Sequence, residues 1–208
     1  MSFATTAEAF TPRQQQVLTA ALSLLVEQGD RLTMTSVARR ASCSKETLYK
    51  WFGDRDGLLT ATVQFQAAKV RVPQVDRRRI DAASFRISLE QFARDLLGTI
   101  SGEVSVTLNR LAITHAGAEK PGLGDIVLEN GPLGIRRRLK PMLDAGREAR
   151  VLRFESSEEA YRVFFGLVVR DVQIRLLLGE PIALGEAEIA RDAALAAEQF
   201  LKIYGVDG

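Results

Sequence analysis

The chain has 208 residues, of which 46% are hydrophobic and 26% charged, which allows one large globular domain or two small ones with a sizeable core. It contains no secretory leader pattern and no run near the roughly 18 uncharged apolar residues of a membrane span, so we expect a soluble, cytoplasmic protein with no membrane partner. Cys43 is the only cysteine, which excludes an internal disulfide and Cys-rich zinc sites. The formal net charge of +2 is too small to indicate nucleic-acid binding, so any basic surface must be local.

The first predicted helix begins after Thr11. Thr11 suits the N-cap, Pro12 the first helical position and Gln14 the return contact of a capping box. Apolar residues then recur every three or four positions and predict a core face of Val17, Leu18, Ala21, Leu22 and Leu25. Gly29 is a suitable left-handed C-cap.

Three further helices are predicted next. Thr33 can cap the second helix, and the run 42–44 interrupts it. Ser44 can cap a third helix over about 45–51, and Asp54 can cap a fourth that begins near Arg55.

From the fourth helix onward, the chain shows helical spacing without strand-like alternation. The patterns cover about 55–71, 84–101, 103–116, 123–147, 157–179 and 186–204. Gly131 and Pro132 lie inside one pattern and should break or kink it. The sequence therefore predicts an all-α protein of about nine helices.

The segment from Thr33 to Phe52 has the parts of a helix-turn-helix: two short helices, a tight turn and apolar residues that lock the pair. The inward set is Val37, Ala38, Ala41, Leu48 and Phe52, and the outward set of the third helix is Lys45, Glu46, Thr47, Tyr49 and Lys50. Lysine, threonine and tyrosine side chains can bond phosphates and base edges. Residues 12–55 also carry seven basic and four acidic residues, a local excess of +3.

Residues 37–59, VARRASCSKETLYKWFGDRDGLL, resemble the signature of the TetR family of bacterial transcription regulators. Ser42, Cys43 and Trp51 depart from it, since the family usually has Gly, Val and Tyr or His there. Ser42 must then adopt the turn geometry at some strain. Cys43 is interpreted as a small buried hydrophobe, with a redox-sensing thiol as the alternative.

The resemblance implies sites as well as a fold. The family's DNA contacts fall on Thr35, Ser44, Lys45, Thr47, Tyr49, Lys50, Trp51 and Arg55, and Glu46 is a non-contact or specificity-filtering position. It implies an N-terminal three-helix DNA-binding domain over 1–54, joined through the fourth helix to a helical bundle over 55–208 that binds an effector and dimerises. No catalytic residue and no cofactor is expected.

The C-terminal half resembles the family more loosely, in residues 110–116, Leu123 and 146–150, which are similar to regulatory domains of the AefR-like type. Residues 161–178 are apolar on nearly every side, and the surplus face needs a partner. We expect a homodimer whose interface includes Phe164, Val168, Val172, Ala190, Ala194, Ala197 and Leu201.

The effector site is the least defined element. Candidate wall residues are Phe65, Phe85, Phe92, Leu96, Leu111, His115 and Phe165, although ordinary core packing is the alternative for most of them. His115 can be a core or interface histidine, or one that reads a ligand or pH. One histidine and one cysteine far apart in sequence cannot form a metal site.

The resemblance favours a repressor that a small molecule releases from a palindromic operator. A dimeric DNA-binding regulator without effector control, and an activator, remain alternatives. An enzyme is disfavoured because the sequence lacks a Gly-rich phosphate loop, a nucleophile elbow and a metal constellation.

Overall fold

The computed structural model describes residues 10–75, 80–114, 116 and 122–206. Its contacts divide the chain into two compact units, Met1–Lys69 with Gly102–Gly134, and Val70–Ser101 with Ile135–Gly208. This is a division by packing. A functional boundary near residue 54 stays a prediction.

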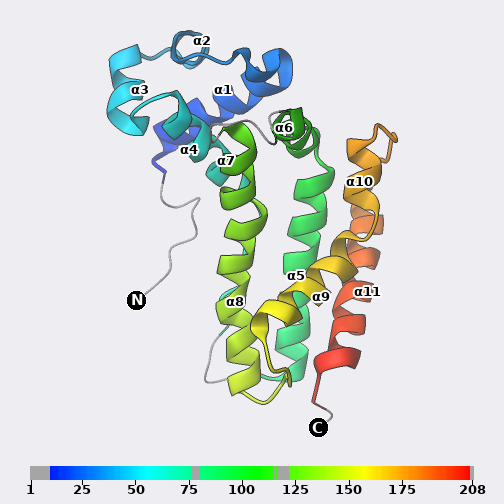
Figure 1. Cartoon of the computed structure of the whole chain (residues 1–208). Coiled ribbons are helices and arrows are strands. Elements are labelled where there is room, and N and C mark those ends of the chain that lie inside the picture. Colours follow the sequence, from blue (N-terminus) through cyan, green and yellow to red (C-terminus); the bar gives the residue numbers. More distant parts are fainter. Residues whose placement is uncertain (1–9, 76–79, 115, 117–121, 207–208) are drawn as a thin grey trace. The chain divides into compact units, whose positions relative to one another are not determined.

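The first unit holds the predicted helix-turn-helix. Its helices are α1 (Pro12–Gln28), α2 (Met34–Arg40), α3 (Lys45–Phe52), α4 (Arg55–Ala67), α6 (Glu103–Thr114) and α7 (Leu123–Asn130), with a 3-10 turn over Gly29–Arg31 (Figure 1). Helix α1 packs against α2, α4 and α6, and α4 packs against α7. Fully buried side chains that include Leu18, Leu25, Val37, Leu48 and Leu58 fill the core of this unit.

The predicted caps are confirmed. Thr11 forms a capping box with Gln14, and Thr33, Ser44 and Asp54 each accept a hydrogen bond from a backbone N–H in the first turn of the next helix. At Gly29 the expected positive φ is present, at 63°, but its ψ of −136° lies outside the left-handed helical region.

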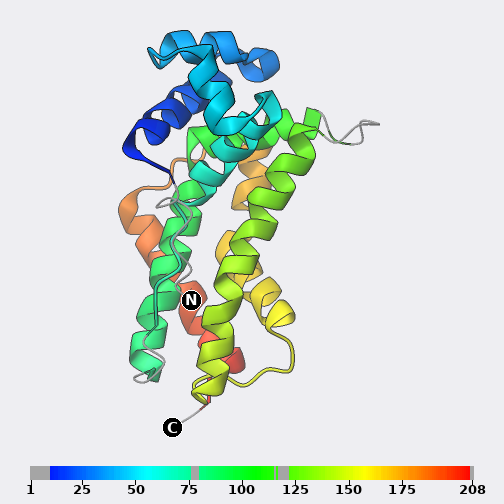
Figure 2. The same cartoon turned by 90° about the vertical axis from the view of Figure 1, so that its left-hand side faces the viewer.

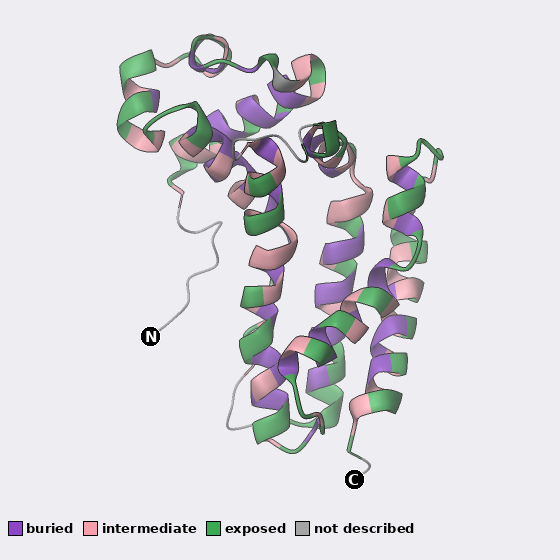
Figure 3. Ribbon diagram, in the orientation of Figure 1, coloured by how far each residue is buried: buried purple, intermediate pink, exposed green. Residues whose placement is uncertain are grey.

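The second unit is a helical bundle of α5 (Ala82–Ser101), α8 (Pro132–Glu148, of which the first three residues count with the other unit), α9 (Ser157–Val169), α10 (Val172–Leu177) and α11 (Glu186–Tyr204). Helix α5 runs alongside α11 in both views (Figures 1 and 2). The ring of Phe164 lies 5.9 Å from that of Phe92 on α5 and 5.0 Å from that of Phe200 on α11, centroid to centroid. Buried and exposed residues alternate along these helices (Figure 3), as expected for helices with one face in a core.

Two predicted helices are each divided in the structure, so the described part of the chain has eleven α-helices where nine were expected. The first break was anticipated: α7 ends at Asn130 and α8 begins at Pro132, whose missing N–H is tolerated at a first helical position.

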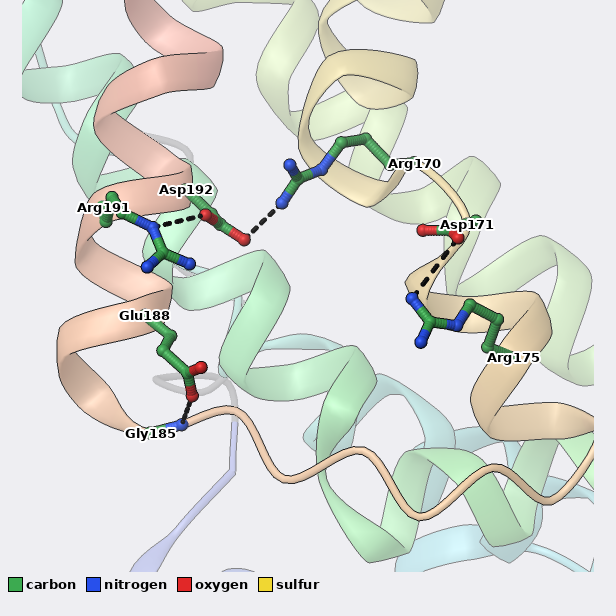
Figure 4. A network of polar contacts seen from close by, with 7 residues as sticks. All are labelled: Arg170, Asp171, Arg175, Gly185, Glu188, Arg191 and Asp192. Atoms are coloured by element: carbon green, nitrogen blue, oxygen red, sulfur yellow. Dashed lines mark hydrogen bonds and ion pairs between the residues drawn. The ribbon is translucent and has the colours of Figure 1, made fainter.

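The second break was not anticipated. Arg170 separates α9 from α10 with φ 46° and ψ −130°, a conformation that favours glycine. Its guanidinium pairs with Asp192 on α11 (Figure 4). Asp192 lies 22 residues further along the chain, so helical periodicity does not reveal this contact.

The all-α prediction is confirmed for the described residues, where β pairing is limited to one isolated bridge between Leu152 and Gly205. None of the helices described is both long and apolar enough to cross a membrane.

Candidate nucleic-acid interface

The turn between α2 and α3 is a Schellman motif built around Ser42. The N–H of Cys43 donates to the Ala38 carbonyl at 3.0 Å, and the N–H of Ser42 donates to the Arg39 carbonyl at 3.3 Å. Ser42 has φ 49°, so the strain expected for a non-glycine residue at this position is present. The turn therefore keeps the geometry of a glycine turn without a glycine.

Arg13 secures this turn from α1. Its guanidinium donates to the backbone carbonyls of Ala41, at 2.7 Å, and Ser42, at 2.9 Å. These carbonyls follow α2 and have no partner within that helix, so a cation there also interacts favourably with the helix dipole. The sequence did not reveal this role, because Arg13 and the turn are 28 residues apart.

One face of helix α3 packs against the core, and the other face is exposed to solvent. Leu48 is fully buried, and Ala41 and Phe52 are partly buried against the same core. The side chains of Lys45, Tyr49 and Lys50 are exposed, and Tyr49 has an exposed fraction of 53%, which is large for an aromatic side chain. Of the predicted outward set, only Thr47 is half-buried; the other four residues are exposed, as a reading helix requires.

The first turn of α3 is fixed by Ser44. Its hydroxyl accepts from the Thr47 N–H at 3.1 Å and lies 3.1 Å from the Thr47 hydroxyl. Hydrogen bonds from its own backbone N–H and from Ser44 hold the pKa of Glu46 below its ordinary value. The carboxylate at this helix end stays ionised, which is consistent with a residue that repels phosphate.

Of the three remaining predicted contacts, Trp51 and Arg55 are partly engaged within the protein. Trp51 is half-buried, and its ring meets that of Phe52 edge-on, with the centroids 6.1 Å apart. The Nε of Arg55 donates to the Leu32 carbonyl at 3.0 Å. Thr35, near the start of α2, is exposed.

Not every basic side chain near α3 is equally available to contact DNA. Arg40 donates two hydrogen bonds to Glu27 on α1, at 2.8 and 2.6 Å, which raises the pKa of Arg40 and lowers that of Glu27. Arg40 is therefore engaged by Glu27, whereas Lys45 and Lys50 on α3 are exposed.

Comparison with known proteins agrees with this geometry. The family model described as the tetR family of bacterial regulatory proteins matches residues 17–62, and the C-terminal domain of AefR-like transcriptional repressors matches residues 88–206. The chain belongs to the TetR family.

Solved structures of TetR-family proteins share the fold over nearly the whole chain. A TetR transcriptional regulator from Agrobacterium tumefaciens is 47% identical, with a TM-score of 0.79 over 95% of this chain and 97% of its own. The flavonoid-responsive regulator FrrA is 28% identical, with a TM-score of 0.68 over 94% of this chain and 98% of its own.

A curated relative matches over a shorter stretch. The HTH-type transcriptional regulator YdeS from Bacillus subtilis is 30% identical over 90 residues, which are 42% of this chain and 46% of that protein.

TetR-family proteins are transcription regulators that bind DNA and act as dimers, and they are not enzymes.

The residues predicted to line an effector site fall in both compact units. Phe65 and Leu111 pack against the core of the first unit. Phe85, Phe92 and Leu96 are fully buried in the second, where Phe165 is half-buried with its ring 5.8 Å from that of Tyr161. His115 lies outside the described residues.

The residues predicted for the dimer interface lie mostly inside their own subunit. Phe164, Val168, Val172 and Ala197 are buried, and Ala190, Ala194 and Leu201 are half-buried. The large apolar side chains exposed on or beside α10 and α11 are instead Ile174, Leu178, Leu195, Ile203 and Val206.

Proposed function

We propose that this TetR-family regulator is a repressor that binds a palindromic operator as a homodimer and leaves it when a small molecule binds. The observation that carries the DNA-binding part is α3 itself. Its buried Leu48 and the turn locked by Arg13 fix the helix, while Lys45, Tyr49 and Lys50 remain exposed. Such a helix can enter a major groove with its lysines on phosphates or guanine edges.

The proposed contacts are the eight positions named from the family signature, and the DNA-binding part is residues 1–54. Residues 55–208 would provide the effector site and the dimer contacts. Two-fold symmetry would place the two α3 helices in major grooves about one turn of DNA, or a multiple of it, apart. A regulator of chromosomal DNA in a bacterium acts in the cytoplasm.

Repression and effector control are each supported by one likeness. The matching C-terminal family model is described as that of a transcriptional repressor, and FrrA, 28% identical, is described as flavonoid-responsive. Helix α4 begins three residues after α3 ends, so a ligand that moves α4 would reorient the reading helix. A flavonoid is therefore the first probe to try.

Selection of genomic fragments by the purified protein tests the DNA-binding proposal. We expect enrichment of a short inverted repeat by the wild type and none by Lys45→Ala with unchanged helicity and dimerisation. Failure to enrich any sequence with the wild type would refute it.

Transcription in vitro from a promoter that contains the selected site then separates the alternatives. A repressor lowers transcript yield and an activator raises it. Release by a flavonoid such as naringenin supports effector control. A panel of small molecules that leaves operator affinity unchanged would favour the regulator without an effector.

A further inference from the structure

Gln66 carries a buried acceptor that the chain does not satisfy. It lies on α4 with an exposed fraction of 6%, and its Nε2 donates to the Ser105 hydroxyl on α6 at 3.0 Å. Its Oε1 is also buried, and it has no hydrogen-bond partner among the described residues. A buried carbonyl oxygen left without a donor costs free energy, so such a group points to a partner from outside the chain.

The nearby polar groups do not supply that donor. Thr62, one turn earlier on α4 and fully buried, donates its hydroxyl to the Leu58 carbonyl at 2.7 Å. On α6, Asn109 directs its side-chain amide to the Ser105 carbonyl at 2.8 Å. By contrast Gln64, two residues before Gln66, donates to Asn130 on α7 at 2.9 Å and is only half-buried.

The surroundings indicate the chemistry of the missing partner. The buried polar residues of α4 and α6 are the uncharged Thr62, Gln66 and Ser105. Val63 and Leu108, on the same two helices, are buried and apolar. Bringing a charged group into such surroundings is costly, whereas a neutral hydroxyl on an apolar body suits them.

We propose that Gln66 is an effector-binding residue whose Oε1 accepts a hydrogen bond from the hydroxyl of a neutral, apolar small molecule. This inference rests on the effector control proposed above and names the class of effector. The same Gln66 side chain ties α4 to α6 through Ser105, and α4 follows α3 directly. A hydroxyl bound here therefore changes a contact of the helix that positions the reading helix.

Phenol and toluene provide a matched pair of probes, because they share a ring and differ by a hydroxyl against a methyl group. We expect phenol to bind the wild-type protein at least about tenfold more tightly than toluene, as a site that hydrogen-bonds a hydroxyl discriminates against its absence. In a titration monitored by NMR, phenol should shift the side-chain amide signal of Gln66 and toluene should not.

Gln66→Met keeps an unbranched side chain of similar length and removes the acceptor, and Gln64→Met is the matched control on the same helix. The preference for phenol should vanish in Gln66→Met and persist in Gln64→Met, with helicity checked by circular dichroism. Equal binding of the two probes to the wild type, no phenol binding, or a preference that survives in Gln66→Met would overturn the inference. The wild-type titration decides the matter even if Gln66→Met does not fold.

These measurements use no DNA and so separate the two proposals. Enrichment of an operator without a phenol preference would reject the role of Gln66 alone. A Gln66-dependent preference without any operator would support the site and reject the regulatory function.

Discussion

Replacement of Ser42 by glycine should stabilise the protein. Ser42 has φ 49°, and its side chain is exposed at the surface of the turn. Left-handed backbone costs an L-residue about 1–2 kcal/mol, and the greater freedom of glycine in the unfolded chain offsets about 0.5–1 kcal/mol of the relief. We therefore expect Ser42→Gly to raise the free energy of unfolding by about 0.5–1 kcal/mol. Chemical denaturation should show a higher midpoint at an unchanged slope.

Ser44→Gly is the matched control, two residues further on. Ser44 has an ordinary φ of −78° and caps α3 through the Thr47 N–H. The same substitution should cost a few tenths of a kcal/mol there, since glycine is a slightly poorer cap. The strain argument fails if Ser42→Gly lowers the midpoint, or if Ser42→Ala raises it equally.

Three further substitutions test the contact made by Arg13, which the sequence did not reveal, and the shifted pKa values of Glu27 and Tyr161. Arg13→Met removes two hydrogen bonds from the turn, so the free energy of unfolding should fall by about 1 kcal/mol. Operator affinity should also fall, because α3 is then less firmly oriented. The pKa of Glu27 is lowered chiefly by its hydrogen bond from Arg40, so the pair should stabilise the fold above the ordinary carboxyl value of 4.5 and lose that effect as pH falls. Denaturation of Glu27→Gln should show no such loss. Burial raises the pKa of Tyr161 from 10.0 to about 12. The stability that the neutral phenol contributes below pH 10 should therefore be lost as pH rises toward 12. Tyr161→Phe should not show this contribution to the loss.

Local features were predictable because local chemistry determines them. The N-caps at Thr11, Thr33, Ser44 and Asp54 follow from a polar side chain placed three residues before the N–H that it meets. The burial of Leu48 follows from helical spacing.

Contacts between distant segments were not predictable. The bonds from Arg13 to the turn and from Arg170 to Asp192 join residues 22 to 29 positions apart, and neither leaves a mark in the spacing of apolar residues. The pairing of Gln66 with Ser105 is of the same kind, at a separation of 39 residues.

The apolar segment 161–178 could be predicted only in part, for a different reason. A segment that is apolar on nearly every side must be covered, but periodicity does not say whether its own chain or a partner covers each face. Phe164 and Val168 turned out to be buried in their own subunit, whereas Ile174 and Leu178 are exposed. The segment is therefore divided between buried and exposed apolar side chains, and the dimer interface stays a prediction.

The most direct test of the central claim is the affinity of α3 variants for the selected operator, measured at several salt concentrations. Lys45→Ala and Tyr49→Ala should lose operator binding at moderate salt. Where Lys45→Ala still binds at low salt, the slope of log affinity against log salt should be smaller by about one, because one phosphate contact is lost. Lys69→Ala, which replaces an exposed lysine beyond the helix-turn-helix, should bind as the wild type does. Intact binding by both α3 variants would contradict the account.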